Sequence, residues 1–132
     1  MQRLSYVALI VRDYDEAIAW FTDKLGFMLL EDAPREGGKR WVRIAASADS
    51  QTSLLLARAA NDEQLAQVGR FAGGRVGLFL QVDDFGGQYS RMVERGVRFC
   101  EQPRHESYGS VVVFEDLYGN RWDLLGPAPR ES

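Results

Sequence analysis

Apolar residues along this chain recur first with the period of a strand and then with the period of a helix. Arg3 to Val11 is a β-branched and apolar run typical of a buried strand. Asp13 follows, with Glu16 three residues later, a pattern that starts helices. Apolar residues then recur at helical spacing up to a glycine stop: Tyr14, Ala17, Ile18, Phe21, Leu25 and Gly26. This segment predicts a strand followed by a helix.

Three further strands are predicted after this helix, separated by turn-forming residues. They cover residues 27–31, 39–46 and 52–57. Asn61 can cap a short helix that ends before Gly73, and we interpret residues 61–73 as a linker. A first module is therefore expected over about residues 1–60.

The second half of the chain repeats the same order of elements. A strand at 76–82 leads to a capped helical stripe, and strands follow at 97–101, 110–115 and 121–125. The stripe with its cap and stop consists of Asp84, Phe85, Tyr89, Met92, Val93 and Gly96. Asp13 aligns with Asp84 and Gly26 with Gly96, at offsets of 71 and 70 residues. We therefore predict one α+β domain, residues 1–132, of two tandem β-α-β-β-β modules, the second over about 74–132.

Composition narrows the class of protein. The chain has 132 residues, 45% of them hydrophobic, which is enough for the core of one domain. Its formal net charge is -3 and its cations are scattered, so we expect no nucleic-acid partner. Cys100 is the single cysteine, which excludes an internal disulfide and a CxxC motif. The N-terminus lacks an apolar signal region and no segment has membrane-spanning length, so a cytoplasmic protein without a membrane partner is expected.

Three stretches of this sequence resemble the vicinal oxygen chelate superfamily, which includes glyoxalase I, bleomycin-resistance proteins and extradiol dioxygenases. They run from Tyr6 to Asp13, from Ala17 to Phe27 and from Tyr108 to Asp123, and together they span nearly the whole chain. The resemblance implies that the curled mixed sheets of the two modules form a cup-shaped cleft for a small molecule. It also implies a homodimer.

The resemblance also bears on a metal ion. Enzymes of this superfamily place metal ligands, usually His, Glu or Gln, on the first and last strands of each module. The matching positions here are Tyr6 and Ser53 in the first module, and Gly77 and Asp123 in the second. Only Asp123 is an ordinary ligand for a divalent metal, so this sequence departs from the family pattern, and no metal ligands and no cofactor are predicted. A displaced divalent metal held by Asp123, His105 and Tyr6 is the alternative.

Alternation along the strands predicts which side chains line the cleft. If Val7, Leu9 and Val11 pack under the helix, the intervening residues face the cleft. Gly77 there either leaves room for a ligand or marks a strand bulge. The resemblance puts the loop 104–109 near the mouth of the cup. The ligand-binding candidates are Tyr6, Ser53, Gly77, Phe79, Gln81, Tyr108, Arg121 and Asp123.

Asp123 and His105 are the candidates for catalysis. A carboxyl group among apolar side chains has its pKa raised by desolvation. Asp123 then accepts a hydrogen bond from a ligand, acts as a general base, or simply pairs with Arg121 on a solvated rim. His105, the single histidine, is either an acid or base near the mouth of the cup or an ordinary surface residue.

Three functions are compatible with these residues. The first is a metal-free protein of the bleomycin-resistance type that binds a small, partly apolar or aromatic molecule. The second is a lyase, isomerase or dioxygenase-like enzyme that uses Asp123 and His105 with or without a displaced metal. The third is an interaction subunit whose cup is filled by its own side chains. We expect the binding protein, and the sequence does not decide whether any reaction is catalysed.

Overall fold

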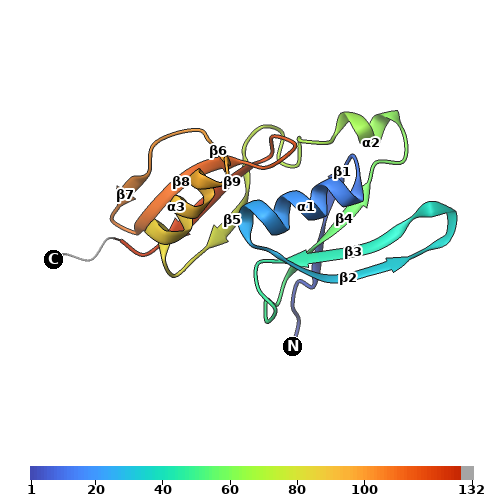
Figure 1. The fold of residues 1–132 in the computed structure, drawn as a ribbon, viewed down its shortest axis with the longest axis horizontal. Coiled ribbons are helices and arrows are strands. Elements are labelled where there is room, and N and C mark those ends of the chain that lie inside the picture. Colours follow the sequence, from blue (N-terminus) through green and yellow to red (C-terminus); the bar gives the residue numbers. More distant parts are fainter. Residues whose placement is uncertain (129–132) are drawn as a thin grey trace. The chain divides into compact units, whose positions relative to one another are not determined.

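The computed structural model describes residues 1–128, and it has two compact units with one sheet each (Figure 1). The first unit is Met1–Phe71 and the second begins at Ala72. The last four residues of the expected second module lie outside the described residues. None of the helices in residues 1–128 is long and apolar enough to cross a bilayer.

The first unit contains a four-stranded mixed sheet with strand order β1-β4-β3-β2. Strands β1 and β4 pair in parallel, and the other neighbours are antiparallel. Helix α1 contacts β2, β3 and β4. The elements are β1 (Tyr6–Val11), α1 (Tyr14–Leu25), β2 (Met28–Pro34), a 3-10 turn (Glu36–Gly38), β3 (Arg40–Ala45), β4 (Ser53–Arg58) and α2 (Asp62–Ala66).

The second unit repeats this order with one additional strand. Its sheet has the order β5-β9-β8-β6, with β7 paired to β8. Strands β5 and β9 are parallel, as β1 and β4 are in the first unit. The elements are β5 (Val76–Gln81), α3 (Phe85–Glu94), β6 (Arg98–Phe99), β7 (Arg104–Glu106), β8 (Gly109–Glu115) and β9 (Arg121–Gly126). The predicted α+β fold of two tandem β-α-β-β-β modules is confirmed.

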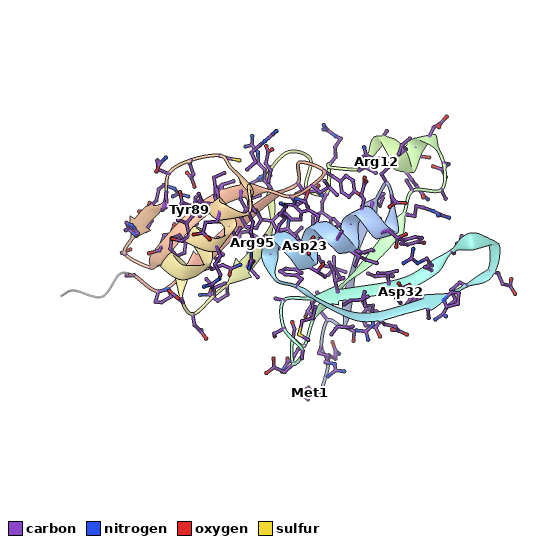
Figure 2. All side chains as sticks on the ribbon, in the orientation of Figure 1. Met1, Arg12, Asp23, Asp32, Tyr89 and Arg95 are labelled. Carbon is purple, nitrogen blue, oxygen red and sulfur yellow. The ribbon has the colours of Figure 1, made fainter. Side chains whose placement is uncertain are left out.

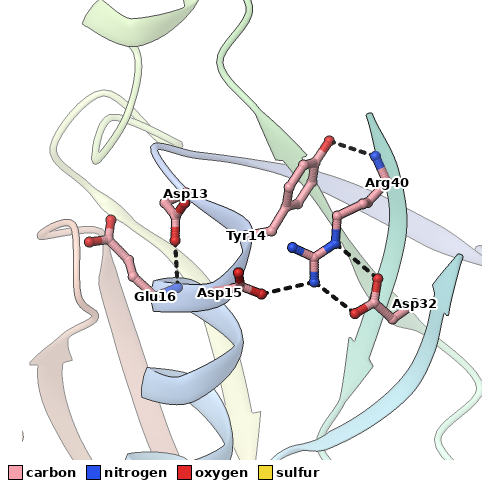
Figure 3. A network of polar contacts seen from close by, with 6 residues as sticks. All are labelled: Asp13, Tyr14, Asp15, Glu16, Asp32 and Arg40. Carbon is pink, nitrogen blue, oxygen red and sulfur yellow. Dashed lines mark hydrogen bonds and ion pairs between the residues drawn. The ribbon is translucent and has the colours of Figure 1, made fainter. Parts of the chain in front are cut away.

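The caps predicted from the sequence begin and end the helices. Oδ2 of Asp13 accepts a hydrogen bond from the backbone N of Glu16 at 2.8 Å (Figure 3). Gly26 ends α1 in the left-handed conformation, with φ of 74°. Oδ1 of Asp84 accepts a hydrogen bond from Gly87 N at 3.0 Å and caps α3 in the same way.

Each sheet buries the face that its helix covers. The buried residues shared by α1 and the first sheet are Leu9, Val11, Tyr14, Ala17, Phe21, Leu25, Val42, Ile44, Leu54 and Leu56. The corresponding residues of the second unit are Leu80, Phe85, Met92, Val112, Phe114, Trp122 and Leu124. Tyr89, labelled in Figure 2, packs edge-to-face on Phe99 with 4.8 Å between ring centroids. Val93 is exposed, so its predicted place in the apolar stripe of α3 is wrong.

Two predicted boundaries and one predicted loop differ from the structure. Strand β2 continues to Pro34, because the turn of the hairpin is confined to Glu36–Gly38. The strand predicted at 97–101 is shortened to β6, Arg98–Phe99. Beyond it, the Glu101 side chain and not a backbone carbonyl accepts the N–H of Val113 on β8, at 3.0 Å. Residues 104–106 of the predicted loop form β7, which pairs with β8.

Candidate functional site

The helix-free face of the first sheet carries a polar and aromatic cluster around Arg43. Its Nε donates to Glu31 Oε1 at 2.9 Å, and its Nη1 donates to Ser53 Oγ at 3.2 Å. The same guanidinium lies over the Tyr6 ring, 4.9 Å from its centroid. Tyr6 meets Trp41 edge-to-face at 6.2 Å between ring centroids. Strands β1, β2, β3 and β4 thus bring one cation and two aromatic rings together.

Strand register explains this cluster. Tyr6 pairs with Ser53 in the β1–β4 ladder, and Glu31 pairs with Arg43 in the β2–β3 ladder. Val42 and Ile44 point into the core, so Trp41 and Arg43 take the opposite face. The sequence placed Tyr6 and Ser53 among the candidates but missed Glu31, because its pairing with Arg43 depends on a bulge between Leu29 and Glu31.

Asp123 lies on the helix-free face of the second sheet. It pairs with Phe79 of β5 in the parallel ladder, and Phe79 is 62% exposed. Oδ1 of Asp123 is buried and has no hydrogen-bond partner among the described residues. Burial raises the pKa of Asp123; nearby Arg104 opposes this rise and Glu101 adds to it. The carboxyl group is therefore a partly desolvated acceptor beside an exposed ring.

A second cluster flanks Asp123 on strand β7. Nε of Arg104 donates to Glu101 Oε1 at 3.0 Å, and its Nη1 donates to Glu106 Oε1 at 3.2 Å. The expected alternative, an ion pair between Asp123 and Arg121 on a solvated rim, is absent among the described residues. The sequence missed the role of Arg104, because a short polar strand gives no alternating pattern.

The remaining ligand-binding candidates of the second unit are solvent-accessible. Gln81 and Arg121 are exposed, and Tyr108 is 70% exposed in the turn between β7 and β8. The ladder between β5 and β9 shifts register between Val76 and Leu78, so Gly77 occupies a bulge. Because of this shift, Phe79 and not Leu78 lies directly opposite Asp123.

His105 lies on the other side of the second sheet from Asp123. It pairs with Ser110, and its Nδ1 lies 2.8 Å from Ser110 Oγ. The ring of Phe85 on α3 is 6.5 Å away between centroids, so His105 is on the helix-covered side. Asp123 pairs with Val113, whose side chain points to the opposite face from that of Ser110. The structure does not bring the two catalytic candidates together within this unit.

The four positions that hold metal ligands in family enzymes do not carry a set of metal ligands in this chain. Of these positions, Ser53 accepts a hydrogen bond from Arg43, Gly77 has no side chain, and Asp123 pairs with Phe79 in the β5–β9 ladder. Within residues 1–128, no three His, Cys, Asp or Glu side chains are grouped so that they could hold a metal ion. These residues do not fit a divalent cation, which needs several oxygen or nitrogen ligands from one site.

Comparison with known proteins identifies relatives along nearly the whole chain. A protein of Shewanella frigidimarina (strain NCIMB 400) is 50% identical over 125 residues, which cover 94% of this chain and 93% of that protein. The crystal structure of UcmS2 is 28% identical with a TM-score of 0.82, covering 95% of this chain and 98% of UcmS2. TnmS3, an antibiotic binding protein from Streptomyces sp. CB03234, is 28% identical with a TM-score of 0.76, covering 97% and 98% of the two chains.

The family assignment rests on a match that includes both modules. Residues 3–124 match the family model of the Glyoxalase/Bleomycin resistance protein/Dioxygenase superfamily. That span begins at Arg3, just before β1, and ends at Leu124 within β9, and it includes Tyr6, Ser53 and Asp123. The chain therefore belongs to the glyoxalase/bleomycin resistance protein/dioxygenase superfamily.

Proposed function

We propose that this protein binds a small, partly aromatic molecule on the helix-free face of its second sheet, and that Asp123 is the polar anchor. The bound molecule presents an O–H or N–H group to the carboxylate and an apolar surface to Phe79. A few placed polar groups within an apolar lining are the usual construction of a small-molecule site.

The observation that carries this proposal is the unpartnered Oδ1 of Asp123. A buried acceptor without a hydrogen bond costs about 1–3 kcal/mol, so such atoms are rare unless a ligand or a water completes them. Phe79, which is its register neighbour, is 62% exposed and offers a ring on which a planar molecule can pack. The similarity to TnmS3, an antibiotic binding protein, supports the same class of function.

A thermal-stability screen tests this function. Amphipathic aromatic compounds with hydroxyl or amine groups are added to the whole protein, and hits are measured by calorimetry. A ligand at 100 times its Kd stabilises the folded state by about 2.7 kcal/mol. We expect hits to lose affinity in Asp123→Asn and Phe79→Ser and to keep it in Asp83→Asn, which alters an exposed acid of the same unit. Silence across a broad panel, or equal binding to Asp123→Asn, refutes the proposal.

An enzyme that uses Asp123 alone is the second candidate. The raised pKa of Asp123 favours its use as a general acid or base. His105, which lies on the other face of the sheet, does not take part in this reaction. Incubation of each screening hit with stoichiometric protein, followed by mass spectrometry, distinguishes the two functions. Recovery of unchanged compound identifies a binding protein, and a product that is lost in Asp123→Asn identifies an enzyme.

We also propose a homodimer that works in the cytoplasm. Met28 and Leu29 are exposed on β2, which is an edge strand of the first sheet, and an exposed apolar edge favours self-association. Cys100 is free and exposed, and an unpaired thiol of this kind suits a reducing compartment. Cell fractionation tests the location, and light scattering after size-exclusion chromatography tests the oligomeric state.

A further inference from the structure

The first unit contains a pocket that the site at Asp123 does not include. Its volume is about 550 Å³, within the range of small-molecule sites. It lies where the start of β3 and the end of β4 separate, beside the turn of the β2–β3 hairpin and the segment leading to α2. The lining residues are Tyr14, Arg35, Gly37, Lys39, Arg40, Trp41, Leu55, Leu56, Ala57, Arg58, Ala59, Ala60 and Gln64.

Strand pairing accounts for the opening. Strands β3 and β4 pair only from Val42 to Ile44 against Leu54 to Leu56. Continuing that register by two residues would set Arg40 opposite Arg58, and like charges directly opposite each other disfavour pairing. Both guanidinium groups instead lie over the ring of the buried Tyr14, each 5.1 Å from its centroid. The separation leaves the pocket between the two strands.

Arg40 is neutralised behind the pocket. Its Nη2 lies 2.9 Å from Asp15 Oδ1 and 2.7 Å from Asp32 Oδ2, and its backbone N donates to Tyr14 Oη at 3.2 Å (Figure 3). The hydrogen bond from Arg40 lowers the pKa of Asp32, which keeps this carboxylate charged. Arg40 therefore anchors the hairpin to α1.

Three other cations face the pocket without a carboxylate partner among the described residues. Nη2 of Arg58 donates to the carbonyl of Gly38 at 3.2 Å, and Nη1 of Arg35 donates to the carbonyl of Pro34 at 3.2 Å. Lys39 is exposed and takes part in no ion pair within residues 1–128. No acidic residue of the described chain lines the pocket. A chain of net charge -3 thus has a locally cationic pocket.

The rest of the lining is apolar. Leu55, Leu56 and Ala57 supply aliphatic surface. Trp41 supplies an aromatic wall, and the guanidinium of Arg35 lies over it at 5.6 Å from the ring centroid. Cations beside an apolar and aromatic surface match a molecule that has an anionic head on a planar body, because guanidinium groups bind carboxylates and phosphates in the same fork geometry.

We propose that this pocket binds an organic anion, with a carboxylate or phosphate head near Lys39 and Arg58 and a planar body along Trp41. The site lies wholly in the first unit, so it is independent of the proposed site at Asp123 in the second.

Three probes that share one ring system test the charge requirement: 2-naphthoate, 2-naphthyl phosphate and uncharged 2-naphthol. The probes are compared on the whole chain carrying Asp123→Asn, because 2-naphthol has the ring and hydroxyl group proposed to bind at Asp123. Calorimetry at low salt should detect both anions, with naphthol at least about tenfold weaker, a difference of about 1.4 kcal/mol. Binding should weaken at 1 M salt, where the Debye length falls to about 3 Å. The tighter of the two anions identifies the head group. Absence of binding by both anions, or equal binding by naphthol, overturns the proposal.

Variants locate the binding. The double variant Lys39→Gln with Arg58→Gln should bind the anions about tenfold more weakly, since each substitution removes a charge-assisted contact with the anionic head. Lys39→Gln alone removes no ion pair found within residues 1–128 and should give a smaller loss of affinity in the same direction. The matched control is Arg3→Gln with Arg70→Gln, which removes the same charge from two exposed sites outside the pocket. Unchanged affinity in both Lys39 variants, or an equal loss in the control, overturns the proposal. Asp123→Asn should bind the anions with the affinity of the native protein, because Asp123 lies outside the pocket.

Discussion

Asp116 shows how one buried carboxylate organises the turn between β8 and β9. Its Oδ1 accepts the backbone N–H groups of Tyr118 and Asn120, each at 3.0 Å. Its Oδ2 accepts Nδ2 of Asn120 at 3.1 Å and Nε1 of Trp122 at 3.0 Å. Burial raises the pKa of Asp116, while these four donors act in the opposite direction. The turn was predicted from its sequence, but this hydrogen-bond network was not.

Asp116→Asn should destabilise the protein by about 1–3 kcal/mol. The amide has one acceptor oxygen in place of two. Either Nδ2 of Asn120 and Nε1 of Trp122, or the backbone N–H groups of Tyr118 and Asn120, would then face an N–H group. Urea unfolding of the whole chain measures the loss. Asp83→Asn, which changes an exposed acid in the same unit, should stay within about 0.5 kcal/mol of the native protein. Equal stability of the two variants contradicts the structural role of Asp116.

The raised pKa of Asp123 predicts a pH dependence of stability. A folded-state pKa above the unfolded value means that the folded protein holds this proton more tightly. The contribution of Asp123 to stability is then fully present below the unfolded pKa of about 3.9, and it is lost as the pH rises through the folded pKa. The difference in unfolding free energy between native protein and Asp123→Asn should therefore fall with rising pH across that window. Urea titrations at several pH values measure it, and a difference that grows with pH contradicts the assignment.

At the scale of elements, long amphipathic segments were predictable and short polar ones were not. The stripe from Tyr14 to Leu25 gave the bounds of α1, because its period, its Asp13 cap and Gly26 agree. Strand β7 was not predictable, because its pairing comes from β8 and not from a pattern of its own. The same applies to β6, where the Glu101 side chain replaces a strand partner at Val113 N.

Two glycines of the second unit should respond to alanine with opposite signs. A Cβ at Gly126, where β9 ends, would lie 2.6 Å from Phe85 Cβ at the start of α3. Gly126→Ala should therefore cost about 1–3 kcal/mol through overpacking. A Cβ at Gly86 in the first turn of α3 meets open space, and Gly86→Ala should stabilise the protein by about 0.4–1 kcal/mol. Thermal unfolding compares the variants, and a shift of the same sign in both contradicts the packing of β9 on α3.

For the whole molecule, the internal repeat was the strongest signal in the sequence, and it predicted both sheets. It did not predict the chemistry of their helix-free faces. Alternation assigned Tyr6 and Ser53 to one face, but the Arg43 cluster requires the pairing of Glu31 across a bulge. A one-residue shift at Gly77 likewise placed Phe79 beside Asp123. Strand register depends on contacts between segments that are distant in the chain. The periodicity of one strand therefore does not predict where a bulge shifts its register against the next strand.

The proposed homodimer leads to a prediction about the edge of the first sheet. Met28 and Leu29 on β2 are 44% and 43% exposed, although both are large and apolar. Light scattering after size-exclusion chromatography should give twice the 14.9 kDa of one chain. Leu29→Lys should shift the mass toward that of one chain, because a lysine on an edge strand opposes association with a second apolar edge. The matched control is Leu65→Lys, which puts the same charge on the exposed α2 and should leave the dimer intact. A native protein that is monomeric at all concentrations contradicts the dimer, whereas a dimeric Leu29→Lys contradicts only the use of β2 as its contact.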